Sequence, residues 1–129
     1  MIDLRGKKFG LISLGCDKNR VDSEKLLSVI AENGCKITDD INETQILIIN
    51  TCAFLNEARK EAIETVLEYS VYKSVNLEKI VVTGCLPQKY IDETFFDLTE
   101  VDVFLGTNDY DKLFEALETA YSGERVNFV

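Results

Sequence analysis

Three short apolar runs in the chain each end on a cysteine, and this repetition constrains the fold more than any other feature. The runs are Phe9–Cys16, Ile46–Cys52 and Ile80–Cys85, and each is followed by a polar stretch that begins a helical pattern. Runs rich in Ile, Val and Leu are typical of strands buried on both faces of a parallel sheet. The carboxyl ends of such strands lie at one edge of the sheet, where ligands bind. We therefore expect the three thiols to meet in space and predict a metal site there.

Strand and helix patterns alternate along the chain, which predicts right-handed crossovers and a parallel sheet. The predicted strands are Phe9–Leu14, Cys35–Thr38, Gln45–Asn50, Lys79–Thr83 and Val101–Leu105, and the predicted helices are Val21–Asn33, Glu57–Lys73, Gln88–Phe96 and Tyr110–Tyr121. Five strands and four helices fit a doubly wound, flavodoxin-like α/β fold with strand order 2-1-3-4-5 and helices on both faces. That order places the first, third and fourth strands side by side, and these are the strands that precede the cysteines.

Length and charge restrict the class of protein. The 129 residues suffice for one domain with a real core, and the net charge is −9. A free-standing nucleic-acid binder normally carries the opposite charge, so the acidity indicates a solvated surface, a basic partner or a basic neighbouring domain. No apolar run approaches the roughly 18 residues that span a bilayer, and the first residues lack the apolar core of a signal peptide. We expect a cytoplasmic protein with no membrane partner.

The chain has four cysteines and no histidine. In a cytoplasmic protein, such thiols indicate metal or redox chemistry more than disulfides. Without histidine, a soft-metal site must be built largely from sulfur. Three thiolates at one edge would suit an iron–sulfur cubane in which one iron is open to an external ligand. They would also suit a zinc ion. Alternatively, all three cysteines are small buried residues in tight turns. For the fourth, Cys35, at the start of the second strand, burial is the interpretation we favour.

Three sequence motifs resemble a known family. Leu14–Glu24, Asn50–Phe54 and Val82–Leu86 are similar to the N-terminal domain of the radical-SAM methylthiotransferases, and they occur in the same order. The resemblance runs from about Lys8 to Leu117. It implies that Cys16, Cys52 and Cys85 hold an auxiliary [4Fe-4S] cluster, whose open iron takes part in sulfur or methylthio transfer. No catalytic residue is identified.

Two branches of that family act on different substrates. One methylthiolates adenosine derivatives in tRNA, and the other, RimO-like, methylthiolates the β-carbon of an aspartate in a small-subunit ribosomal protein. The segments Ser13–Glu24 and Asn50–Leu55 resemble the RimO-like branch more closely. The acidic chain also suits a basic ribosomal protein as substrate. We keep a tRNA substrate as the alternative.

The chain departs from the family pattern in one respect. The radical-SAM domain of such enzymes carries a Cys-x3-Cys-x2-Cys motif with a second [4Fe-4S] cluster and S-adenosyl-L-methionine, and no cysteines here are so closely spaced. We expect residues 1–121 to form the cluster domain, inactive alone, and residues 122–129 to begin a linker to a radical-SAM domain. The competing hypotheses are a flavodoxin-like binding module with incidental cysteines and a small zinc-thiolate protein.

Overall fold

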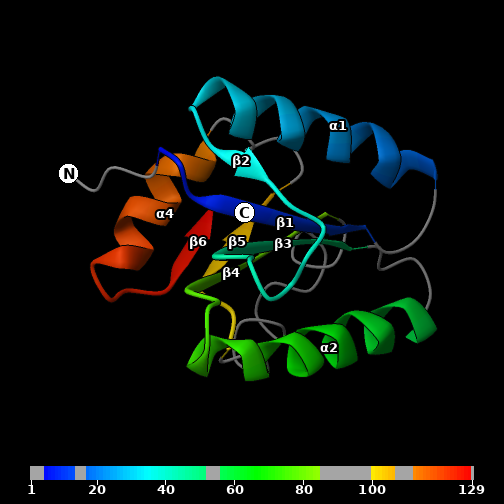
Figure 1. Cartoon of the computed structure of the whole chain (residues 1–129). Helices are drawn as coiled ribbons and strands as arrows, with labels where there is room; N and C mark the ends of the chain where they lie inside the picture. Colours follow the sequence, from blue (N-terminus) through cyan, green and yellow to red (C-terminus); the bar gives the residue numbers. More distant parts are fainter. Residues whose placement is uncertain (1–4, 14–16, 52–55, 85–99, 107–111, 129) are drawn as a thin grey trace.

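A computed structural model describes residues 5–13, 17–51, 56–84, 100–106 and 112–128. Its sheet has six parallel strands in the order β2-β1-β3-β4-β5-β6 (Figure 1). The strands are β1 (Lys8–Ser13), β2 (Lys36–Ile37), β3 (Ile46–Thr51), β4 (Lys79–Gly84), β5 (Val103–Leu105) and β6 (Val126–Phe128). The helices are α1 (Asp17–Glu32), α2 (Asn56–Ser70), the 3-10 helix η1 (Val71–Ser74) and α4 (Leu113–Tyr121).

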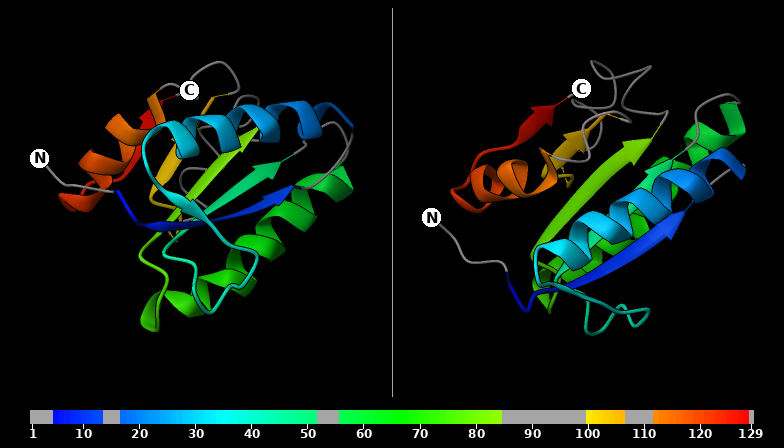
Figure 2. Two further views of the ribbon diagram at one scale, coloured as in Figure 1. Left: turned by 45° about the horizontal axis from the view of Figure 1, so that its top comes forward. Right: turned by 90° about the horizontal axis from the view of Figure 1, so that it is seen from above.

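Helices cover both faces of the sheet. Helices α1 and α4 lie on one face, and α2 lies on the other (Figures 1 and 2). Successive residues of a strand point to opposite faces, and the central strand β3 follows this rule. Its Ile46 and Ile48 pack in the core beneath α1 and α4, whereas Leu47 and Ile49 pack in the core beneath α2. A strand with apolar residues on both faces reads as a continuous apolar run, which is why these segments were recognisable in the sequence.

The predicted fold class and the order 2-1-3-4-5 of the first five strands are confirmed. The predicted helix Gln88–Phe96 lies outside the described residues. Strand β2 is shorter than predicted because a turn follows it at once. The backbone N–H of Asp40 donates to Thr38 Oγ1 (3.1 Å), and the Asp40 carboxylate accepts from the N–H of Asn42 (2.9 Å). Such local side-chain bonds compete with the strand ladder.

Other element boundaries also differ from the prediction by a few residues. Helix α1 begins at Asp17, ahead of the predicted Val21, in a polar stretch without apolar periodicity. Helix α2 ends at Ser70 and tightens into η1, where the Ser70 hydroxyl donates to the carbonyl of Leu67 (2.8 Å). Strand β5 begins two residues late because the carboxylate of Asp102 accepts the backbone N–H of Ile80 (2.9 Å) in place of a ladder bond.

The sixth strand was not predicted. It lies within residues 122–129, which we expected to begin a linker, and it extends the sheet beyond β5. The chain turns at Gly123, whose φ of +103° favours glycine, and the N–H of Val126 then donates to the carbonyl of Asp102 (2.9 Å). Arg125 Nε donates to the carbonyl of Val101 (3.2 Å). Unlike β5, which is apolar throughout, this three-residue strand is interrupted by Asn127 and gives no continuous apolar run, so the prediction of five strands missed it.

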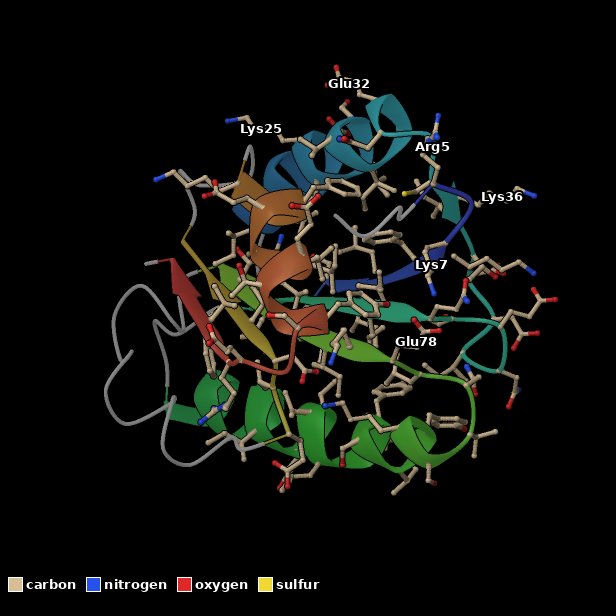
Figure 3. The ribbon with its side chains drawn as sticks, turned by 90° about the vertical axis from the view of Figure 1, so that its left-hand side faces the viewer. Arg5, Lys7, Lys25, Glu32, Lys36 and Glu78 are labelled. Atoms are coloured by element: carbon tan, nitrogen blue, oxygen red, sulfur yellow. The ribbon has the colours of Figure 1, made fainter. Side chains whose placement is uncertain are left out.

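A charged network ties together the edge at which the strands begin, which we call the amino edge. Glu78, just before β4, accepts hydrogen bonds from Lys7 Nζ (2.7 Å) and from the Tyr121 hydroxyl (2.5 Å), and Lys7 and Glu78 lie side by side in Figure 3. Burial by itself raises the pKa of Glu78, but the hydrogen bonds and the charge of Lys7 outweigh it. The pKa of Glu78 is therefore below its usual 4.5, while burial and the contact with Glu78 raise the pKa of Tyr121.

The lowered pKa of Glu78 predicts a specific pH dependence. The stabilisation it provides is fully present above the pKa of the unfolded chain and is lost as the pH falls through the lower pKa of the folded protein. We expect Glu78→Gln to be less stable than the wild type at neutral pH, and this difference to shrink below a pH of about 4.5. Urea unfolding of both proteins at several pH values measures it. Glu43→Gln is the control, because Glu43 is 54% exposed in its ion pair with Lys8. A difference unchanged by acid would contradict the prediction.

Candidate metal centre

The three strands that precede the predicted ligands are neighbours, and their ends lie within one residue of the same level. In the register of the sheet, Ser13 of β1 lies beside Asn50 of β3, and Asn50 lies beside Thr83 of β4. The last residues of β3 and β4, Thr51 and Gly84, are also paired. We call this edge, where the strands end, the carboxyl edge. The chain therefore leaves three adjacent strands at one edge, one residue before Cys52 and Cys85 and three residues before Cys16.

The three cysteines themselves lie outside the described residues. Their assignment as ligands of a cluster therefore stays a prediction. Within the ranges that the structure describes, no group of three or more His, Cys, Asp or Glu side chains is placed to hold a metal ion. The described strand ends nevertheless suit a bound metal cluster, because the ends of neighbouring parallel strands lie about 5 Å apart.

The connections at this edge suit an anionic group. Helix α1 follows β1 and covers one face, whereas α2 follows β3 and covers the other (Figure 2). Because the helix after β1 and the helix after β3 cover opposite faces, the topological switch point lies between these two strands. Ligands bind at this point in open α/β sheets. Both helices begin near the carboxyl edge, at Asp17 and Asn56. The unpaired N–H groups and positive dipole of a helix N-terminus favour thiolates and other anions.

Two polar side chains at the same edge are buried, and they were not among the predicted site residues. Asn50 and Thr83 are both 0% exposed. They occupy paired positions on β3 and β4, and the strand alternation places both on the face covered by α1 and α4. The signal was available in the sequence, because each is a polar residue two positions before a predicted ligand, at the end of an apolar run.

Cys35 lies at the amino edge, as expected. It immediately precedes β2, whose residues pair with Lys8 and Phe9 at the start of β1. Its N–H donates to the carbonyl of Ile30 (3.3 Å), and its Sγ lies 3.9 Å from the carbonyl oxygen of Asn33. The half-buried side chain packs against the core beneath α1 and α4. These contacts agree with a packing role for Cys35.

The helices of the described part of the chain are all too short or too polar to cross a membrane.

Comparison with known proteins gives a family and a set of relatives. The model of a family described as "Uncharacterized protein family UPF0004" matches residues 8–106. A protein of Clostridium tetani named ribosomal protein uS12 methylthiotransferase RimO is 51% identical over 111 residues, which are 86% of this chain and 25% of that protein. Proteins with the same name from Acetivibrio thermocellus and Lachnoclostridium phytofermentans are 45% and 44% identical, over 90% and 92% of this chain and 26% and 27% of their own lengths. The chain thus spans about a quarter of the length of these relatives. The resemblance carried by the three motifs is confirmed.

The predicted proximity of the three thiols can be tested without any cofactor. A disulfide requires Cα atoms within about 4.4–6.8 Å, so oxidation links only cysteines that can approach each other. We expect mild oxidation of the folded, iron-free chain to give disulfides among Cys16, Cys52 and Cys85, while Cys35 stays reduced. Peptide mapping by mass spectrometry identifies the pairs, and oxidation in denaturant serves as the control. An intramolecular disulfide to Cys35 in the folded protein would show that the strand ends do not direct the pairing.

Proposed function

Because the chain belongs to the protein family UPF0004, and its relatives carry the name RimO, we propose that it is the auxiliary cluster-binding domain of a methylthiotransferase. The proposed reaction of the whole enzyme adds a methylthio group to the β-carbon of an aspartate in a small-subunit ribosomal protein. The observation that carries the proposal is the register of β1, β3 and β4, whose ends lie within one residue of the same level and within three residues of a cysteine.

We propose Cys16, Cys52 and Cys85 as the ligands of a [4Fe-4S] cluster. Three thiolates occupy three of the four irons, so a bound cluster supplies one iron with an open position for an external sulfur ligand. The protein holds the three thiols together through its sheet register. The helix N-termini at Asp17 and Asn56 favour the thiolate form over the thiol.

A ribosomal protein is the substrate we favour. The names of the relatives specify the ribosomal protein uS12, and the motifs resemble the RimO-like branch. The net charge of −9 suits a basic protein and opposes tRNA, whose phosphates attract Lys and Arg. A tRNA adenosine substrate is the alternative. A ribosomal substrate also implies a cytoplasmic location.

The proposal makes this domain one part of a larger enzyme. The relatives are about four times as long as the matched segment, so the activity requires more than these residues. We propose that a radical-SAM domain of the same polypeptide supplies the second [4Fe-4S] cluster and binds S-adenosyl-L-methionine. Strand β6 is parallel to β5, so its last residue lies at the carboxyl edge. Any chain that follows it leaves the sheet on the side of the proposed site.

Anaerobic reconstitution with iron and sulfide tests the ligand set. We expect the wild-type chain to bind four irons per chain, and Cys16→Ala, Cys52→Ala and Cys85→Ala each to lose most of this uptake, because each removes one of three protein ligands. Cys35→Ala is the matched control: it should bind iron normally and lose on the order of 1 kcal/mol of stability through packing.

Thermal unfolding of all four variants separates a folding defect from a lost ligand. Loss of iron in Cys35→Ala, with retention in any of the other three, would refute the assignment. Uptake of zinc but not iron would favour a zinc-thiolate protein. Absence of any metal would favour a binding module with incidental cysteines.

The substrate is tested in a full-length enzyme that contains this domain. We expect methylthio transfer to the purified ribosomal protein, detected as a mass increase on an aspartate-containing peptide, and no modification of tRNA. The three ligand substitutions should stop transfer and leave reductive cleavage of S-adenosylmethionine intact, since that step belongs to the other domain. Modification of tRNA adenosine instead would establish the alternative substrate.

A further inference from the structure

Strand β1 extends past the end of β2 toward the carboxyl edge, as Figure 2 shows. Only Lys8 and Phe9 of β1 pair with β2, whereas the other side of β1 pairs with β3 as far as Ser13. Exposure rises along β1 where β2 stops: Phe9 is buried, Leu11 is half-buried and Ser13 is exposed. In the part of the chain that the structure describes, the outer side of β1 is therefore open over its second half.

The hydrogen-bond pattern identifies the backbone groups that face this open side. The carbonyl of Phe9 accepts the N–H of Thr38 (2.9 Å) on the side of β2, whereas the carbonyl of Lys8 bonds to the chain just before β3 (2.9 Å). Residues of a parallel strand alternate in this way, so the N–H and C=O groups of Leu11 and Ser13 point outward, as those of Phe9 do. Among the described residues, none forms a backbone hydrogen bond to them on this side.

The segment that follows β2 is held away from the open side by its own hydrogen bonds. Asn76 Nδ2 donates to the carbonyls of Ile41 and Thr44, both at 2.7 Å. The hydroxyl of Thr44 donates to the carbonyl of Asp40 (2.9 Å). These bonds fix the segment against the chain that precedes β4, at the amino edge. It therefore does not continue the pairing with β1, and the open side is a built feature of the fold.

A pocket of about 130 Å³ lies beside this part of β1, and Leu11, Asp39 and Tyr69 are among the residues that line it. An engineered cavity of similar volume, about 150 Å³, binds benzene, so the pocket has room for one side chain. Asp39 is exposed and forms no ion pair with any described residue. The next four residues, up to Glu43, add two carboxylates and no basic side chain. The surroundings of the open side thus favour a Lys or Arg side chain.

An open strand beside a side-chain pocket suits recognition by strand addition, in which main-chain hydrogen bonds give affinity and pockets for alternate side chains give specificity. Resting on the proposed function above, we propose that the outer side of β1 binds an extended, basic segment of the ribosomal protein substrate. The segment pairs with Leu11 and Ser13 and places a Lys or Arg beside Asp39. It then runs along β1 to the carboxyl edge, where its aspartate reaches the proposed cluster. A second copy of this chain is disfavoured as occupant, because its net charge is also −9.

Amide hydrogen exchange of this chain, followed by NMR, tests the pairing directly. The probes are overlapping peptides that cover the ribosomal protein uS12. We expect a peptide that contains the modified aspartate and a basic residue to slow the exchange of the Leu11 and Ser13 amide protons by about tenfold or more, because exchange then requires release of the added strand. The amide protons of Gly10 and Ile12 face β3 and should not change. N-methylation of the peptide amides that face β1 should abolish binding.

A pair of charge reversals tests the role of the acidic pocket. We expect Asp39→Lys to weaken peptide binding about tenfold, because like charges that face each other across an interface are strongly unfavourable. Glu124→Lys is the matched control, since Glu124 is also exposed but lies in the turn before β6, on the opposite side of the sheet. Both variants change the net charge equally, and Glu124→Lys should bind the peptide as the wild type does. Thermal unfolding of both variants shows that they remain folded.

Three outcomes would overturn the inference: no peptide binds, a peptide binds without slowing exchange at Leu11 and Ser13, or the two charge reversals weaken binding equally. Slow exchange at Leu11 without peptide, in a chain that sedimentation shows to be a dimer, would make a second copy the occupant and overturn it as well. Each of these results leaves iron uptake and methylthio transfer by the full-length enzyme untouched, so the proposed function is tested separately. Strand addition by the peptide in a chain that takes up no iron would instead refute the cluster and retain the binding site.

Discussion

The parallel register of β1, β3 and β4 is the constraint on which the rest of the structure depends. Parallel pairing aligns strands that are distant in sequence, and here it brings Ser13, Asn50 and Thr83 to one level. The crossovers through α1 and α2 then cover opposite faces and leave the carboxyl edge between them. Because a slip by one residue would turn each side chain to the other face, the buried Ile and Val residues that hold this register also determine what the edge presents.

The two edges of the sheet serve different purposes. At the amino edge, described side chains satisfy one another: Asp102 pairs with Lys73 (2.7 Å), and Glu78 joins Lys7 to Tyr121. These bonds join segments from the beginning, middle and end of the chain. At the carboxyl edge, the strands that precede the cysteines instead end in polar or small residues on both faces, such as the pairs Asn50–Thr83 and Thr51–Gly84. Side-chain contacts hold the amino edge together, and the carboxyl edge is where we propose the cluster site.

Most of the architecture could be predicted because doubly buried strands leave a strong signal. Runs such as Ile46–Thr51 are apolar at successive positions, and their alternation with helices determines a parallel order. Elements stabilised by single contacts could not be predicted. The late start of β5 depends on one carboxylate at Asp102, and β6 depends on a turn at Gly123 and three paired residues. The sequence shows that Asn50 and Thr83 are polar residues at the ends of apolar runs. Only the structure shows that they are paired and buried on one face.

Strand β6 also determines where this domain can be cut. It pairs along the outer side of β5, whose residues Val103, Phe104 and Leu105 are fully buried. Removing the chain after Tyr121 would leave an apolar strand with an open row of N–H and C=O groups at the edge of the sheet. Such an edge pairs readily with other chains. Strand β6 thus covers the outer side of β5, and a fragment that ends at Tyr121 would expose it.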